Sequence, residues 1–98
     1  MPRPTCPRKI TCTPRARYFK PAGIPLRQLG EVLLAPDELE AVRLADCEEL
    51  YRADAAERMG ISRQTFDRII RRARKKVATA LVKGLALRIE KPARRSAN

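Results

Sequence analysis

Apolar residues recur at helical spacing through the middle of the chain and predict three helices. We expect these helices over residues 37–46, 51–59 and 63–83. The first begins behind Pro36, because proline is tolerated in a first helical turn and the acidic residues after it suit the positive end of the helix dipole. One apolar face of the third helix is formed by Phe66, Ile69, Ile70, Ala73 and Val77. The pattern predicts a mainly α-helical fold.

The boundary between the second and third predicted helices has the residues of a tight turn. Gly60 adopts a positive φ without steric cost, and Ser62 can accept a hydrogen bond from a backbone N–H of the next helix. Two helices that cross over a turn of about three residues need a small side chain where they touch, and Ala56 provides it. The stretch that begins at Leu50 therefore predicts a helix-turn-helix, and together with the helix before it a three-helix core.

Alternation of apolar and polar residues predicts short strands on both sides of the helices. Residues 85–89 alternate with period two, and so do residues 9–13, where disorder is the alternative. The strands near Ile10 and Leu87 can pair with each other within one subunit or across a dimer. Residues 26–34 are expected to form a turn or a short strand that leads into the first helix.

Composition divides the chain into an arm, one domain and a tail. Residues 1–17 hold four prolines and five basic residues, which predicts an extended arm. Residues 18–90 are expected to form a single helix-turn-helix domain, and residues 91–98 a disordered basic tail. Tyr18 and Phe19 are expected to pack on the helical core, because few other aromatic residues are present; a stacking platform for nucleic-acid bases is the alternative.

The end of the third predicted helix carries an apolar stripe that something must cover. This stripe consists of Val77, Ala80, Leu81 and Val82. The N-terminal segment of the same chain and a second subunit are both open as the covering element.

The net charge is +11 and lies mainly toward the two ends of the chain. Residues 1–30 carry seven basic residues and no acidic ones, and residues 61–98 carry twelve basic and two acidic residues. Residues 31–60 carry nine acidic and three basic residues, and we expect Glu38 and Glu40 on a solvated face of the first helix. A cationic excess on one helix and the two ends indicates a polyanionic partner, with a merely soluble basic surface as the alternative.

The sequence lacks the patterns of a metal site or an active site. There is no His, and Cys6, Cys12 and Cys47 form no CxxC pair, so we expect reduced thiols, with Cys47 half-buried, and no metal or other cofactor. We find no phosphate loop and no pair of carboxylates against an apolar pocket, so we do not expect an enzyme. No apolar run is long enough for a bilayer and no signal peptide is recognised, which predicts a cytoplasmic protein without membrane contact.

The start of the third predicted helix is the expected DNA-reading element. In a helix-turn-helix this part enters the major groove, where Arg matches guanine and Gln matches adenine. The residues expected at base edges are Arg63, Gln64, Thr65, Asp67 and Arg68. The residues expected at phosphates are Ser62, Arg71, Arg72, Lys75 and Lys76, with Arg3, Arg8 and Lys9 on the arm. For each charged side chain the alternative is a solvated charge on an exposed helix.

Four collinear motifs, at residues 18–26, 37–46, 55–63 and 80–89, resemble a prokaryotic family of small predicted DNA-binding proteins. This family is domain of unknown function 134, also called uncharacterised protein family 0251, and the resemblance covers about residues 3–90. Residues 34–81 are also similar to the fourth conserved region of bacterial sigma factors, which grips the −35 promoter element. The resemblance implies an all-helical DNA-binding core without a wing, and a regulatory role. Tyr51 and Asp67 depart from the sigma pattern.

We therefore expect a regulator that binds double-stranded DNA sequence-specifically. A homodimer is expected, since paired half-sites about one DNA turn apart double the base contacts. The alternative is a protein-interaction module that docks on RNA polymerase or another regulator without binding DNA itself. RNA is a third possible partner, but few aromatic residues are available to stack on its bases.

Overall fold

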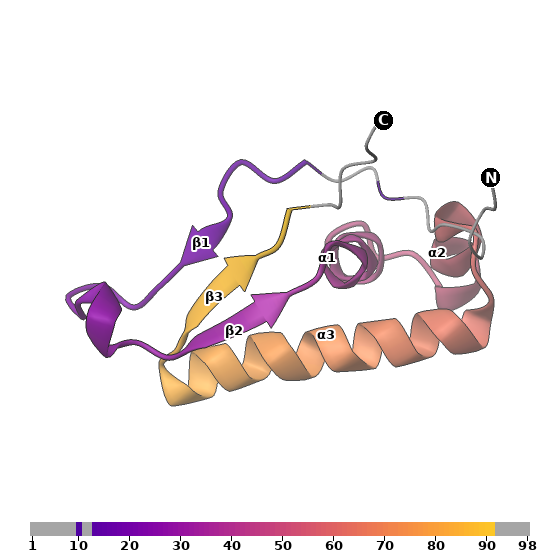
Figure 1. Ribbon diagram of the computed structural model, residues 1–98. Helices are drawn as coiled ribbons and strands as arrows, with labels where there is room; N and C mark the ends of the chain where they lie inside the picture. The colour runs from indigo at the N-terminus through magenta and orange to yellow at the C-terminus, as the bar shows by residue number, and fades with distance from the viewer. Residues whose placement is uncertain (1–9, 11–12, 92–98) are drawn as a thin grey trace, which may run out of the picture.

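The computed structural model describes residue 10 and residues 13–91, and in that part of the chain it contains three α-helices and one three-stranded sheet (Figure 1). The helices are α1 (Pro36–Val42), α2 (Arg52–Met59) and α3 (Arg63–Lys83). The strands are β1 (Tyr18–Phe19), β2 (Glu31–Leu34) and β3 (Ala86–Ile89). A 3₁₀ turn, η1 (Leu26–Gln28), precedes β2, and a π-helical turn, η2 (Arg43–Cys47), follows α1. No helix in these residues is long and apolar enough to cross a membrane.

The sheet corrects the expectation of an all-helical core. Its order is β1-β3-β2, with β3 antiparallel to β1 and parallel to β2. The strand predicted near Leu87 is present, but it pairs with Phe19 and Val32 rather than with the segment near Ile10. Most of that predicted strand lies outside the described residues, and Ile10 itself is not in a strand. Along the sequence, the three helices therefore lie between β2 and β3, and these two strands pair with each other in the sheet.

The connection between α2 and α3 depends on one glycine and one serine. Gly60 has φ 70° and its N–H donates to the carbonyl oxygens of Ala56 and Glu57, which ends α2. Ser62 caps α3, because its Oγ accepts a hydrogen bond from the Thr65 N–H at 3.1 Å. As expected, α3 spans residues 63–83; α2 begins one residue later than expected, with Tyr51 at its N-cap making no side-chain hydrogen bond there.

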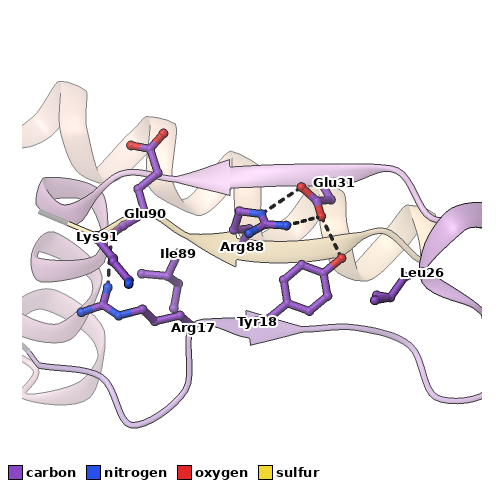
Figure 2. A pocket seen from close by; sticks show the side chains of 8 residues that line it. All are labelled: Arg17, Tyr18, Leu26, Glu31, Arg88, Ile89, Glu90 and Lys91. Atoms are coloured by element: carbon purple, nitrogen blue, oxygen red, sulfur yellow. Dashed lines mark hydrogen bonds and ion pairs between the residues drawn. The ribbon is translucent and has the colours of Figure 1, made fainter.

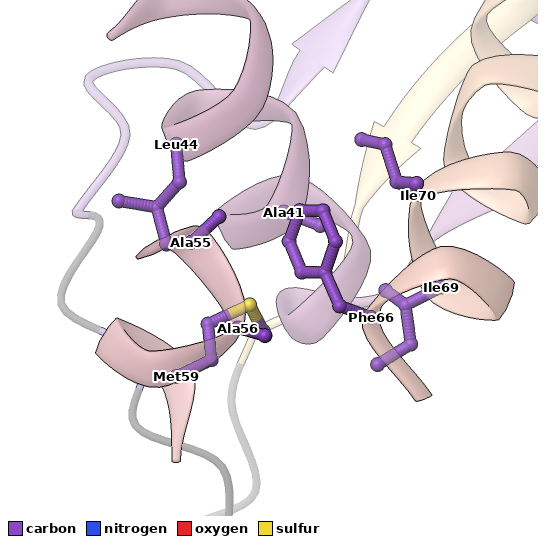
Figure 3. Packing of buried hydrophobic residues seen from close by; sticks show 8 residues of the cluster. All are labelled: Ala41, Leu44, Ala55, Ala56, Met59, Phe66, Ile69 and Ile70. Atoms are coloured by element: carbon purple, nitrogen blue, oxygen red, sulfur yellow. The ribbon is translucent and has the colours of Figure 1, made fainter. Parts of the chain in front are cut away.

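The main hydrophobic core joins all three helices (Figure 3). Phe66 of α3 is fully buried and lies near Ala41 of α1 and Ala56 of α2, where small side chains leave room for its ring. A second cluster, Leu34, Ala73 and Ile89, packs the sheet against α3. Phe19 was expected to be inside, but its side chain is 54% exposed because β1 lies at the edge of the sheet.

The helix expected over residues 37–46 changes its hydrogen-bond pattern after Val42. The N–H of Glu48 donates to the carbonyl of Arg43 at 2.9 Å, a spacing of five residues that widens the turn. The Arg43 guanidinium bonds Glu40 on one side and pairs with Glu48 on the other. Cys47, at the end of this turn, is exposed rather than half-buried.

The expectation that Glu38 and Glu40 are solvated is wrong. Their exposed fractions are 1% and 2%. One carboxylate oxygen of Glu38 accepts from the Ala35 N–H at 2.9 Å and from Lys76 at 2.8 Å, and the other accepts from Arg72 at 2.9 Å. Helical periodicity could not reveal the burial of Glu38, since both of its cations come from α3, more than thirty residues away.

The environment of Glu38 favours its ionised form. Burial by itself raises the pKa of this carboxyl, because a charge loses solvation. The hydrogen bonds from Lys76, the Ala35 N–H and Arg72 outweigh burial, so the pKa lies below its ordinary value of 4.5. The ionised carboxylate therefore holds α1 against α3.

We predict that Glu38→Gln lowers the free energy of unfolding by about 2–3 kcal/mol at neutral pH, because charged hydrogen bonds are lost at a buried site. Since the folded-state pKa is lowered from 4.5, the stabilisation is present above that pH and is lost as the pH falls through the folded value. Urea unfolding at several pH values measures this. The exposed Glu57→Gln is the matched control, and equal losses in both variants would contradict the assignment.

We predict that Gly60→Ala lowers the free energy of unfolding by about 1–2 kcal/mol, because a Cβ is disfavoured at positive φ. Gly60→Asn should cost less, since asparagine tolerates this backbone conformation. Urea unfolding of the two variants gives the comparison. Alanine tolerated as well as asparagine would show that the left-handed turn is not required.

Candidate nucleic-acid interface

The cationic side chains of α3 fall into two groups, and the first group is paired with acids of the same chain. Arg72 and Lys76 both pair with Glu38 of α1. Arg74 binds Asp46 of η2 through two hydrogen bonds of 2.7 and 3.2 Å, which raise the pKa of the guanidinium. These three cations hold α3 to the elements packed on it.

The second group faces solvent. It consists of Arg63, Arg68, Arg71, Lys75 and Lys83, which are exposed, and no described acidic side chain forms an ion pair with any of them. Arg68, Arg71 and Lys75 are spaced by three and four residues, so they lie on one face of the helix, and the exposed Gln64 continues it. We call these three the cationic row. It lies on the side of α3 away from Phe66, Ile69 and Ala73.

Two residues predicted at base edges have partners within the protein. Asp67, 33% exposed, pairs with Arg52 of α2 at 3.3 Å, which links the two helices. Thr65 is half-buried, and its Oγ1 accepts a hydrogen bond from the hydroxyl of Ser62 at 3.0 Å. Arg63 lies at the first position of α3, five residues before Arg68. Arg3, Arg8 and Lys9 fall outside the described residues.

Sequence reasoning missed every one of these ion pairs of α3. Asp46 and Arg74 are 28 residues apart, and Glu38 and Lys76 are 38 apart. The acidic cluster in residues 31–60 signalled only that counter-charges for the basic helix exist within the same chain. Which cations they would neutralise depends on how the helices cross.

A second polar cluster lies on the outer face of the sheet, in a groove of about 760 Å³ (Figure 2). Tyr18 donates its phenolic O–H to Glu31 at 2.8 Å, and Arg88 donates two hydrogen bonds to the same carboxylate at 3.0 Å. The Arg88 guanidinium also lies 5.0 Å from the centre of the Tyr18 ring. The hydrogen bonds from Arg88 and then from Tyr18 lower the pKa of Glu31, and the bond to Glu31 raises that of Tyr18.

This cluster bears on the stacking-platform alternative for Tyr18 and Phe19. Tyr18 uses its hydroxyl within the sheet, and Arg88 covers one face of its ring. Tyr18, Arg88 and Glu31 come from β1, β3 and β2, so the network connects all three strands. A base stacking here would have only one face of the Tyr18 ring open to it.

In the described part of the chain no group of three His, Cys, Asp or Glu side chains is arranged to hold a metal ion. Cys6 and Cys12 are not among those residues, and Cys47 is a free thiol.

Comparison with known proteins identifies relatives over nearly the whole chain. A UPF0251 protein of Moorella thermoacetica is 57% identical over 90 residues, which are 92% of this chain and 60% of that protein. A UPF0251 protein of Vibrio vulnificus is 56% identical over 87 residues, 89% of this chain and 87% of the relative. A third, from Syntrophobacter fumaroxidans, is 58% identical over 89 residues, 91% of this chain and 57% of the relative.

The chain thus spans about three fifths of the length of several relatives. No solved structure matches it. Residues 1–93 match the family described as "Protein of unknown function DUF134". The chain therefore belongs to the DUF134 family, whose members carry the name UPF0251.

Proposed function

We propose that this protein binds double-stranded DNA sequence-specifically and acts as a transcriptional regulator, with α2 and α3 as a helix-turn-helix similar to the fourth region of sigma factors. The observation that carries the proposal is the exposed cationic row of Arg68, Arg71 and Lys75. The turn at Gly60 separates this part of α3 from α2. A regular helix fits the major groove, and unpaired cations there suit a polyanion.

Base reading belongs to the exposed residues of the first two turns of α3. Arg68 can present two N–H groups to guanine, and Gln64 can pair with adenine in the same groove. Arg63 adds a third side chain beside them. Thr65 and Asp67 contribute mainly by holding the turn and α2 in place, through Ser62 and Arg52.

Phosphate contacts belong to Arg71 and Lys75, which continue the row along α3. Arg72 and Lys76, although equally basic, already neutralise the buried Glu38. Using them on DNA would leave a buried carboxylate without its partners, which costs several kcal/mol. They therefore set the position of α3 instead of touching the duplex.

The test begins with selection of bound duplexes from a random library, followed by binding titrations of variants on the selected site. Arg68→Ala should weaken binding about tenfold or more and relax the preference at one base position, because a bidentate contact is worth about 1–3 kcal/mol.

Arg71→Ala should weaken binding to all sequences and reduce the slope of log affinity against log salt concentration by about 1, because one phosphate contact is lost. Arg27→Ala, an exposed cation of η1 without an ion pair, is the control with the same charge change.

Equal affinities for Arg68→Ala, Arg27→Ala and the parent would show that α3 does not read DNA. A chain that retains no duplex at moderate salt would instead support the alternative function, a protein-interaction module on RNA polymerase or another regulator.

A further inference from the structure

The C-terminal end of α3 leaves large apolar side chains in solvent. Leu81 and Val82 are 78% and 83% exposed, and Ala78 beside them is exposed as well. Of the apolar stripe predicted on this helix, the structure buries Ala80 and half-buries Val77. A cluster of this kind on a charged protein marks a contact surface.

An apolar groove of about 530 Å³ lies directly beside these side chains. It runs between the edge strand β1 and the end of α3, since Phe19 of β1 is part of its wall. Lys20 is the one charged residue in its lining, and its ammonium donates to the carbonyl oxygens of Pro21 and Ile24. The apolar lining is Phe19, Pro21, Val77, Leu81, Leu85 and Leu87.

Among residues 1–98, those outside the described part of the chain offer few large apolar side chains for the groove. Residues 1–9, 11–12 and 92–98 are the only ones not described, and Met1 is the one large apolar residue among them. The seven residues after Lys91 are Pro, Ala, Arg, Arg, Ser, Ala and Asn. These residues therefore do not supply a large apolar occupant that buries Leu81 and Val82.

We infer that the occupant is a second copy of this chain, related by a two-fold axis near Leu81. Leu81 and Val82 of each copy enter the groove of the other, so the same patch serves on both sides, as an isologous contact requires. Because the side chain of Ala78 is small, the axes of the two α3 helices can approach to about 8–10 Å, the usual distance between packed helices.

Charge favours this patch for self-association. From Val77 to Val82, α3 has no charged residue, although the chain carries a net charge of +11. The cation before it, Lys76, is already paired with Glu38. The cation after it, Lys83, is exposed, but a helical step of about 100° per residue places it on roughly the opposite side of α3 from Leu81. An antiparallel arrangement about Leu81 also directs the two cationic rows away from each other, which limits their repulsion.

The distance between the cationic rows in such a dimer also suits DNA binding, and this part of the inference rests on the proposed function. Arg68 and Arg71 precede Leu81 by 13 and 10 positions, or about 20 and 15 Å along a helix. In an antiparallel pair the equivalent residues of the two copies are then about 40 and 30 Å apart. These separations bracket the roughly 34–36 Å between successive major grooves on one side of DNA.

Sedimentation equilibrium of the full chain over a wide concentration range tests the contact without DNA. The parent should be a dimer, and Leu81→Glu should weaken dimerisation at least about tenfold, as for a central contact residue. Leu33→Glu, an exposed leucine on the sheet, is the matched control and should dimerise like the parent. Circular dichroism of both variants should match the parent, since both side chains face solvent.

A monomeric parent, dimerisation unaffected by Leu81→Glu, or a dimer broken by Leu33→Glu would each overturn the inference. On DNA, Leu81→Glu should lose the parent's preference for two half-sites one turn apart over a single half-site. A parent that dimerises through Leu81 but retains no duplex supports the contact and contradicts only the proposed function.

Discussion

The structure depends on one buried carboxylate. Glu38 lies in the first turn of α1, where it bonds the backbone N–H of Ala35, and it also receives Arg72 and Lys76 from α3. The side chain of Glu38 thus both caps the N-terminus of α1 and binds α1 to α3. A buried anion is tolerable only with such partners, so the crossing of α1 over α3 is constrained to the geometry that supplies them.

The same interaction decides which cations of α3 remain available. Without α1, the helix presents basic side chains around much of its surface. Glu38 takes two of them on one side, and Asp46 takes Arg74. What remains exposed and unpaired is the row of Arg68, Arg71 and Lys75, together with Arg63 and Lys83 at the two ends of α3. The acidic half of the chain therefore selects the face of α3 that can attract a polyanion, rather than merely reducing the net charge.

Local chemistry made part of this arrangement predictable. The start of α3 and its buried face follow from Ser62 and the apolar spacing, which act within a few residues, and the structure begins that helix accordingly. Gly84, with φ 67°, stands at its C-cap. The strand at Leu87 follows from alternation. The strands that pair with it could not be predicted, because Tyr18 and Arg88 lie 70 positions apart and no local pattern encodes which strands meet. The burial of Glu38 was missed for the same reason.

For the candidate site, the sequence identified the basic residues but not which of them are paired with acidic residues of the same chain and which are unpaired. Arg71 and Arg72 are adjacent and chemically identical, yet one is unpaired and the other bonds Glu38. A helical step of about 100° separates them, and only the position of α1 tells which side is occupied. Asp67, which was predicted at a base edge, pairs with Arg52 in the structure, and its part in base reading stays a prediction.

The length of α3 gives the two proposals a common physical basis. The cationic row lies at positions 6 to 13 of its 21 residues, Glu38 and the core fix the middle of the helix, and residues 77–82 near its end carry no charge. A helix packed along its length does not bend easily, so a contact at Leu81 determines where Arg68 lies. A flexible linker between the same two surfaces would let the half-site spacing vary. Under the two proposals, a continuous helix instead predicts one preferred half-site spacing, so that a change in the pairing of subunits would also change the DNA site that is bound.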